Sequence, residues 1–384
     1  MTPQAGWAAA RPGQRRLLLH AGLHKTGTTA LQHFLHRETA ALLARGVLYP
    51  LAGRIHGSVD HHCIAWQMIG DRRYRREQGT LDALATEIAA FAGDAIVSSE
   101  GFTTLLGQPG GLLPLLTHPA LADHTATVLL YLRDQASFAE SLYFEMLKHG
   151  MAEEAGRMAD SVITLGQVRF REWTFHFDYL SLYRRLAAEP GLTVALRPYA
   201  SLVGGSTVTD FLDFAGLLSG WPQRPESHAN MRNSLGESAE MFCRHRLGWK
   251  AAPPVIRPAA LLLPGGRSMT VTRTGPPPAP RAGSPEGEAM LSGANTLGGG
   301  RKVAFSAAVR AAMQARFAAD NAALAAEAGL PPDTLAIAPE PPPGSLALER
   351  LFSRDLQAAA LDGRPETLTA LFAAATGPTE PGFA

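Results

Sequence analysis

Short, continuously apolar runs alternate with longer amphipathic segments through the first half of the chain. The apolar runs predict buried strands at residues 16–22, 47–50, 95–99, 127–132 and 192–196. Apolar residues that recur every three or four positions predict helices over 29–45, 81–91, 135–148 and 306–328. A further amphipathic helix is predicted by the spacing of Phe170, Trp173, Phe177, Leu180 and Tyr183. Strands and helices that alternate in this way predict an α/β fold with a parallel sheet flanked by helices.

The character of the sequence changes near residue 251, where Pro, Gly and Ser accumulate in stretches such as PPPAPRAGSPEG. This composition is typical of an insert or linker without a packed core. The expected organisation has five parts. They are a flexible N-terminus (1–15), an α/β domain (16–250), a Pro/Gly-rich insert (251–302), a closing helix of the same domain (303–330) and a C-terminal tail (331–384) with a short helix at 345–361.

Composition excludes several classes of protein. Of the 384 residues, 46% are hydrophobic, which is enough for a sizeable core and argues against a wholly disordered chain. Lys and Arg total 35 against 34 Asp and Glu, so the net charge is only +1. Because the chain lacks the overall basic field of a nucleic-acid-binding protein, no nucleic-acid partner is expected. Any phosphate must therefore be bound at a local site.

Two cysteines, Cys63 and Cys243, form neither a disulfide framework nor a Cys-rich zinc module, and they fit a reducing compartment. No stretch approaches about 18 consecutive apolar residues, so no integral membrane segment is expected. The first 16 residues also lack the apolar centre of a secretory signal. We therefore expect a soluble, cytoplasmic protein, while its oligomeric state stays open.

The most informative segment is His-Ala-Gly-Leu-His-Lys-Thr-Gly-Thr-Thr at residues 20–29, between a predicted strand and a predicted helix. Such a loop can turn backbone N–H groups inward as an anion nest, which the positive end of the helix strengthens. Gly22 and Gly27 keep the separation of the nucleotide-triphosphate loop GxxxxGK(S/T), but the lysine stands at Lys25 and Thr28 occupies its usual place. This arrangement favours an activated phosphate over the γ-phosphate of ATP.

At these residues the sequence resembles the sulfotransferase family. The segment HKTGTTALQHFL is similar to that family's 5′-phosphosulfate-binding loop, and it is closest to the carbohydrate-acting branch. The resemblance implies a P-loop-type doubly wound parallel sheet and 3′-phosphoadenosine 5′-phosphosulfate (PAPS) as donor. It also implies that the 5′-phosphate is held by Lys25, Thr26, Gly27, Thr28 and Thr29. Lys25 would stabilise the charge that builds on the departing phosphate. Ala30 stands where many members have an adenine-contacting Trp.

A second pair of residues resembles the family's 3′-phosphate motif. Arg133 closes the predicted strand at 127–132, and Ser141 follows eight positions later in the next predicted helix. An arginine can bind a phosphate bidentately, and a serine hydroxyl adds one donor. A donor that carries 5′- and 3′-phosphates needs two separate anion sites, which this pair and the loop would provide.

Glu100 follows the predicted strand at 95–99, at the carboxyl edge where open parallel sheets bind ligands. The carbohydrate branch uses a glutamate there as general base for the acceptor hydroxyl, so the resemblance implies that role for Glu100. The alternative is that Glu100 caps the next helix.

The remaining polar residues are less specific. His20 and His24 flank the loop and are expected to pack or to face solvent. The segment with His56, His61, His62 and Cys63 lacks metal-ligand spacing, so no metal is expected there. We interpret it as a polar loop near the acceptor, with His62 as a candidate contact. The Gly-Gly-Arg-Lys segment at 299–302 is similar to the basic loop that covers the nucleotide in sulfotransferases, which adds Arg301 and Lys302 as candidate contacts.

The expected function is transfer of a sulfuryl group from PAPS, without a metal, to a hydroxyl of a small-molecule or glycan acceptor, with a carbohydrate or glycolipid as the first choice. Two alternatives stay open. One is a P-loop kinase that consumes ATP with Mg²⁺ to phosphorylate a small molecule. The other is a non-catalytic nucleotide- or glycan-binding module.

Overall fold

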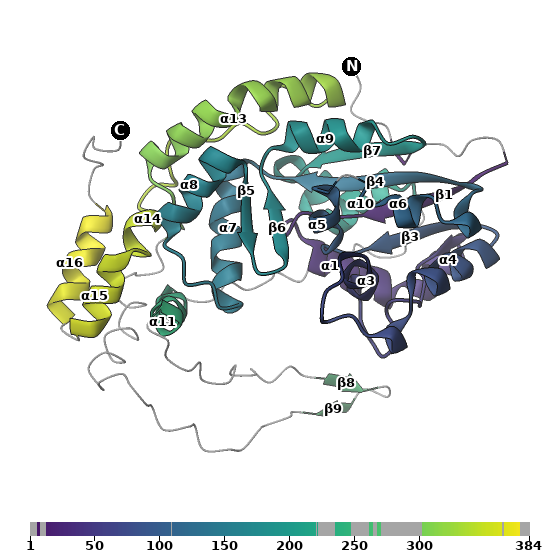
Figure 1. Cartoon of the computed structure of the whole chain (residues 1–384), viewed down its shortest axis with the longest axis horizontal. Coiled ribbons are helices and arrows are strands. Elements are labelled where there is room, and N and C mark those ends of the chain that lie inside the picture. The colour runs from purple at the N-terminus through teal and green to yellow at the C-terminus, as the bar shows by residue number, and fades with distance from the viewer. Residues whose placement is uncertain are drawn as a thin grey trace. The chain divides into compact units, whose positions relative to one another are not determined.

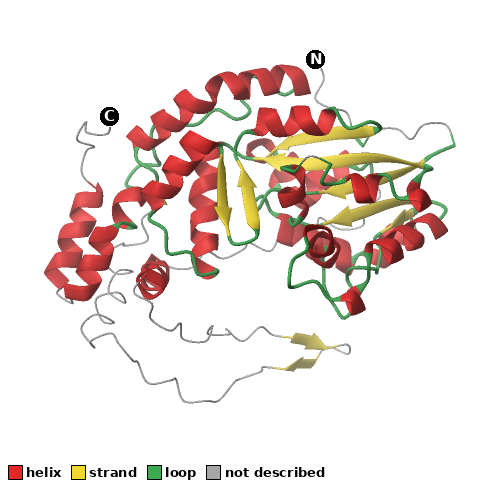
Figure 2. Ribbon diagram, in the orientation of Figure 1, coloured by secondary structure: helices red, strands yellow, loops and turns green. Residues whose placement is uncertain are grey.

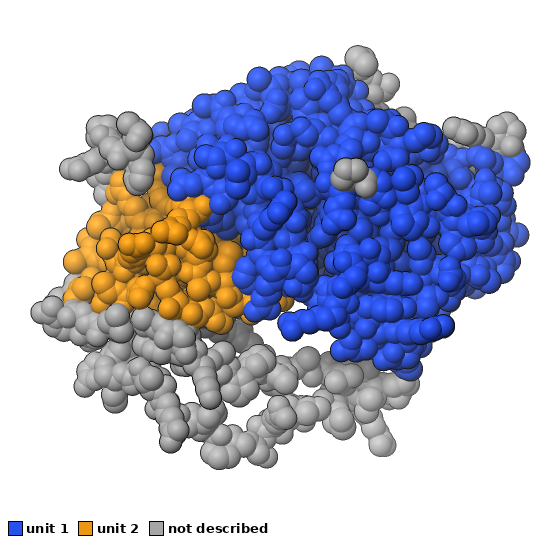
Figure 3. All heavy atoms as spheres, viewed as in Figure 1, with its two compact units in different colours: residues 1–142, 158–232, 307–341 blue, residues 143–157, 233–306, 342–384 orange. Residues whose placement is uncertain are grey.

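The computed structural model describes residues 6–7, 13–108, 110–219, 221, 235–246, 261–263, 267–269, 302–362 and 365–376. The chain divides into two compact units (Figure 3). Unit 1 contains residues 1–142, 158–232 and 307–341, and unit 2 contains residues 143–157, 233–306 and 342–384. Both units are therefore built from stretches that are separate in sequence. Most of the expected N-terminal segment (1–15) and of the expected insert (251–302) lies outside the described residues.

Unit 1 is built on a five-stranded parallel sheet (Figure 1). Its strands are β1 (Arg15–His20), β2 (Val47–Leu48), β3 (Asp94–Ser98), β4 (His124–Leu132) and β7 (Leu192–Pro198), and their order is β2-β3-β1-β4-β7. The central strands are almost wholly buried and apolar, as expected of a parallel sheet that is covered on both faces. The predicted α/β class with a parallel sheet flanked by helices is confirmed.

Helices lie on both sides of this sheet (Figure 2), and α1 and α10 pack against it in one shared core cluster. The longer helices that belong to unit 1 in whole or in part are α1 (Thr28–Arg37), α2 (Thr39–Leu43), α3 (His62–Ile69), α4 (Leu81–Ala90), α5 (Phe102–Leu106), α6 (Leu113–Leu116), α7 (Gln135–Lys148), α8 (Ala155–Leu165), α9 (Tyr179–Ala187), α10 (Thr207–Phe214) and α13 (Ala307–Ala328). Leu18, Phe34, Tyr131 and Phe211 belong to the core cluster that joins the sheet to α1 and α10. This packing fixes the start of α1 against the end of β1.

Two predicted helices differ from the structure. The helix expected over 29–45 is divided at Glu38 into α1 and α2. The helix expected from Phe170 to Tyr183 is wrong. Residues 167–176 instead form an antiparallel hairpin of β5 (Gln167–Phe170) and β6 (Trp173–His176), and α9 begins only at Tyr179. The hairpin turn holds Arg171 at φ 55°, a left-handed conformation that the sequence does not mark with Gly or Asn.

The predicted helix at 306–328 is confirmed as α13. It is held to α7 within unit 1 by a buried amide pair. Asn321 Nδ2 donates to Oε1 of Gln135 at 3.0 Å, and Gln135 Nε2 donates to Oδ1 of Asn321 at 2.8 Å. Two amides that satisfy each other in this way can be buried without an unpaired polar group.

Unit 2 has its own small core, to which Phe242, Leu348, Leu351, Phe352 and Leu356 contribute buried side chains. Its described elements are α11 (Leu235–Arg246), β8 (Leu261–Leu263), β9 (Arg267–Met269), β10 (Val303–Ala304), β11 (Leu346–Ala347), α14 (Leu348–Leu351), α15 (Arg354–Asp362) and α16 (Pro365–Thr376). The single short helix expected over 345–361 is replaced by β11, α14 and α15. In the parts of the chain that the structure describes, no helix combines the length and apolar character that crossing a bilayer requires.

Candidate functional site

The register of the sheet brings the sequence-predicted groups to one edge of unit 1. His20 at the end of β1 lies opposite Ser98 of β3 and Leu129 of β4. Because the strands are parallel, the loop after β1 and Glu100 after β3 leave the sheet side by side. Arg133 follows Leu132, the last residue of β4, on the same edge.

The loop between β1 and α1 has a fixed, strained backbone. Lys25 has φ 67° and Gly27 has φ 82°, and Gly27 is the N-cap of α1 with no side chain that caps it. Thr207 Oγ1 donates to the carbonyl of Thr26 at 2.9 Å, and a Cβ at Gly27 would lie 2.3 Å from that same oxygen. Only glycine fits between the loop and α10, so this contact sets the path of the chain at the start of α1.

The threonines of the loop differ in what their side chains do. The buried hydroxyl of Thr26 donates to the carbonyl of Leu23 at 2.6 Å. Thr28 is also buried, and its methyl group fills the space beside Gly22, where a Cβ would lie 2.3 Å away. Thr29 is exposed. An anion at this loop would therefore be met mainly by the unpaired N–H groups of the first turn of α1, by Lys25 and by Thr29.

A buried histidine supports the loop from below. His20 Nδ1 lies 2.8 Å from Ser98 Oγ, which also accepts from Nε2 of Gln32 at 3.3 Å. Burial lowers the pKa of His20 to about 4, so its ring is neutral near pH 7. The Ser98 hydroxyl has one hydrogen and two lone pairs, so it can accept from Gln32 and still form a hydrogen bond with Nδ1 of His20. These hydrogen bonds join the end of β1 to the end of β3 and to α1, so His20 has a structural role at the base of the loop.

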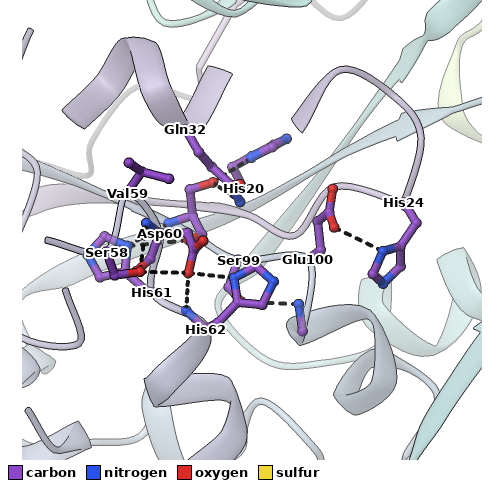
Figure 4. Close-up of polar contacts among 12 residues, drawn as sticks. His20, His24, Gln32, Ser58, Val59, Asp60, His61, His62, Ser99 and Glu100 are labelled. Atoms are coloured by element: carbon purple, nitrogen blue, oxygen red, sulfur yellow. Dashed lines mark hydrogen bonds and ion pairs between the residues drawn. The ribbon is translucent and has the colours of Figure 1, made fainter. Parts of the chain in front are cut away.

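Glu100 forms an ion pair with a residue of the loop itself (Figure 4). Nδ1 of His24 lies 2.9 Å from Oε2 of Glu100, and the side chains are 17% and 16% exposed. Burial alone would raise the pKa of Glu100, but His24, with His62 and His20 adding to it, brings that pKa below its ordinary value. The N-cap of α5 is Gly101, and no side chain caps it. Glu100 therefore faces the loop and is not a helix cap.

His62 lies at the start of α3, with its Nδ1 2.6 Å from Oδ1 of Asp60 (Figure 4). Burial acts to lower the pKa of His62, but the contact and charge of Asp60, with Glu100 adding to them, raise it above its ordinary value. The neighbouring His61 is fully buried, with Nε2 3.0 Å from the carbonyl of Pro50, and burial lowers its pKa to about 3. His61 is structural, whereas His62 adds positive charge near Glu100.

Arg133 and Ser141 occupy different environments. The guanidinium of Arg133 lies over the ring of Tyr199 at 5.6 Å, and Tyr179 holds its backbone by donating to its carbonyl at 3.0 Å. Ser141 is buried on α7. Arg197, the last residue but one of β7, forms an ion pair with the buried carboxylate of Asp210. Arg133 is thus the arginine that this edge offers at the end of β4.

The last two candidate contacts, Arg301 and Lys302, stay predictions. Lys302 is exposed and belongs to unit 2, next to β10. Arg301 lies outside the described residues.

Sequence reasoning missed the partners that organise the site. His24 was expected to pack or to face solvent, and neither Asp60 nor Phe175 was singled out. The ring of Phe175 on β6 packs edge-on against His24, with centroids 5.1 Å apart. The available signal was the position of His24 in the loop after β1, which places it near the residue that follows β3 but does not say which way its side chain points.

Among the described residues, no group of three or more His, Cys, Asp or Glu side chains is placed to hold a metal ion. Comparison of the chain with protein-family models, with curated proteins and with solved structures gives no match. The interpretation of the site therefore depends on its residues and geometry.

Proposed function

We propose that this protein is a PAPS-dependent sulfotransferase of the P-loop type, which moves a sulfuryl group to a hydroxyl of a carbohydrate or glycolipid. One observation carries the proposal. The loop that bears Lys25 and the carboxylate of Glu100 meet at one edge of the sheet, joined by the ion pair between His24 and Glu100 at 2.9 Å. A phosphosulfate bound in the loop would thus have the His24–Glu100 pair beside it, which could accept the proton of an acceptor hydroxyl.

The donor would be held at two places. N–H groups at the start of α1, together with Lys25 and Thr29, would bind the 5′-phosphate, and the first turn of α1 has no acidic residue to oppose it. Arg133 and Ser141 would bind the 3′-phosphate, with Arg133 next to the loop because β4 pairs with β1. A ligand with only one phosphate would use only one of these places.

In the reaction, the acceptor oxygen attacks sulfur in line with the bridging oxygen of the phosphate. The Glu100–His24 pair removes the proton of the acceptor hydroxyl. Lys25 and the backbone N–H groups stabilise the negative charge on the departing phosphate, and adenosine 3′,5′-bisphosphate leaves. These groups meet a smaller charge than a triphosphate presents, so the proposal includes no metal.

Isothermal titration calorimetry tests the donor site. Adenosine 3′,5′-bisphosphate should bind in the presence of EDTA, and adenosine 5′-monophosphate should bind more weakly because it lacks the group that Arg133 would contact. ATP should bind poorly with or without Mg²⁺. Tight binding of ATP that requires Mg²⁺, with no binding of the bisphosphate, would support a kinase and contradict the proposal.

Turnover tests catalysis separately from binding. Radiolabelled PAPS, incubated with a panel of neutral, amino and acidic sugars and glycolipids, should transfer label to at least one acceptor. A protein that binds the bisphosphate but transfers label to none of these acceptors would be a binding module instead.

A further inference from the structure

His24 is held in one orientation at the centre of the site. It lies in the loop immediately before Lys25, with Nδ1 facing Oε2 of Glu100 and the edge of its ring packed against Phe175. Nε2 is on the other side of the ring from Nδ1, and no described residue forms a hydrogen bond with it. A histidine whose Nδ1 faces a carboxylate and whose Nε2 is available has the arrangement of a general base with its orienting acid.

Three histidines influence Glu100, and they differ in their contacts. His20 is fully buried, with Nδ1 on Ser98, and His62 has its Nδ1 on Asp60. His24 is the one that contacts the carboxylate of Glu100, and its side chain, like that of His62, is partly exposed. Of the three, His24 is therefore the partly exposed histidine whose ring Glu100 can orient.

The electrostatics favour the imidazole over the carboxylate as the base. A carboxylate with a lowered pKa takes up a proton weakly, so Glu100 alone would remove the proton of a hydroxyl inefficiently. For His24, a carboxylate that accepts from Nδ1–H fixes the tautomer with a lone pair at Nε2, which is the atom that can take up the proton of a hydroxyl.

We propose that Nε2 of His24 accepts the proton of the acceptor hydroxyl, and that Glu100 is the positioning residue that orients the His24 ring. This inference depends on the proposed sulfuryl transfer. In the step, the O–H bond of the acceptor breaks and its proton moves to Nε2, while the acceptor oxygen forms a bond to sulfur. The bond between sulfur and the bridging oxygen breaks, and its electron pair leaves with adenosine 3′,5′-bisphosphate. The imidazolium then returns its proton to water.

Glutamine variants distinguish the two bases. His24→Gln should lower the rate of transfer by roughly 10²- to 10⁴-fold, because the proton acceptor is lost. Glu100→Gln should keep more of the rate than His24→Gln, because its amide oxygen can still accept from Nδ1–H and hold the ring. His33→Gln, at an exposed position on α1, is the matched control and should keep the full rate. Calorimetry with adenosine 3′,5′-bisphosphate should show that all three variants keep their donor affinity.

Chemical rescue gives a second readout that a merely structural role would not produce. Added imidazole should restore part of the rate of His24→Ala, and it should restore less in His24→Ala/Glu100→Ala. A higher rate in His24→Gln than in Glu100→Gln, together with no rescue of His24→Ala by imidazole, would overturn the inference and leave Glu100 as the base. If instead the wild-type protein binds no bisphosphate and transfers no label, the proposed function itself fails.

Discussion

The amide of Ser99 donates to the carbonyl of His20 at 3.1 Å, one residue beyond the last pair of the β1–β3 ladder. This bond extends the pairing to the point where both strands end, so Glu100 is placed directly beside the loop that begins at Ala21. The amide of Ala21 in turn donates to the carbonyl of Leu129 on β4 at 3.1 Å. The backbone therefore fixes the relative positions of the loop and Glu100 before any side chain contributes.

Lys25→Ala tests the cation of the loop. Lys25 is only partly buried and lies outside the core, so the variant should fold with the circular dichroism spectrum and Tm of the wild type. Its rate of transfer should fall by roughly 10²- to 10³-fold, because the charge on the departing phosphate loses its stabilising group. Lys148→Ala, at the end of α7, is the control and should keep its activity. Turnover of Lys25→Ala at the wild-type rate would remove Lys25 from the mechanism.

Arg133→Ala tests recognition of the 3′-phosphate. Loss of a guanidinium that binds a phosphate should weaken binding of adenosine 3′,5′-bisphosphate by roughly 10- to 100-fold. Binding of adenosine 5′-monophosphate should change little, because it lacks that phosphate. Calorimetry with both nucleotides measures the difference, and the exposed Arg76→Ala is a charge-matched control. Equal losses for the two nucleotides would show that Arg133 does not contact the 3′-phosphate.

Gly27→Ala tests the shape of the loop. The left-handed backbone at Gly27 costs an alanine about 1–2 kcal/mol, and its Cβ would also lie 2.3 Å from Thr207 Oγ1. Gly46→Ala has a similar φ of 73° but nothing within 4 Å of the added Cβ, so it measures the backbone cost alone. Urea denaturation should show a larger loss for Gly27→Ala, and calorimetry should show weaker binding of the bisphosphate only for that variant. Equal losses of stability would mean that the contact with Thr207 is unimportant.

The Asp60–His62 pair predicts a dependence of stability on pH. The pKa of His62 is raised above its ordinary value of 6.5. The contribution of His62 to stability is therefore fully present below pH 6.5 and is lost as the pH rises through the raised pKa. Burial acts to raise the pKa of Asp60, but the contact and charge of His62 outweigh it and bring that pKa below its ordinary value of 3.8. The contribution of Asp60 to stability is therefore present above pH 3.8 and is lost as the pH falls through the lowered pKa. Asp60→Asn should lower the free energy of unfolding most between pH 3.8 and pH 6.5.

The measurement is the free energy of unfolding of wild type and Asp60→Asn across a pH series, with the exposed Asp160→Asn as control. The difference between wild type and Asp60→Asn should shrink as His62 loses its proton at higher pH. A difference that stays constant across the series would show that Asp60 stabilises the fold without any contribution from the charge of His62.

Much of the sheet could be predicted, because β1, β3, β4 and β7 are short apolar runs that leave little alternative to a buried strand. The hairpin at 167–176 could not, because Phe170, Trp173 and Phe177 also match helical spacing and because Arg171 occupies a turn position where glycine or asparagine is the usual signal. The spacing of apolar residues cannot distinguish a helix from a β-hairpin when the same residues fit both patterns.

The site was predictable in part for a related reason. Parallel strands end at one edge, so the positions of Lys25, Glu100 and Arg133 relative to the strands follow from the sequence. The pairing of Glu100 with His24 does not follow from the sequence, because the direction of the His24 side chain depends on the backbone at Lys25 and Gly27, both of which have positive φ. Side-chain pairs across two loops depend on such conformations and leave no periodic pattern in the sequence.

A structure of the protein with adenosine 3′,5′-bisphosphate bound is the most direct test of the donor site. We expect the 5′-phosphate to lie within the loop at residues 22–29, in contact with the N–H groups at the start of α1 and with Nζ of Lys25. We also expect the 3′-phosphate at Arg133. A nucleotide bound elsewhere on the protein, with no phosphate in contact with this loop, would contradict the account.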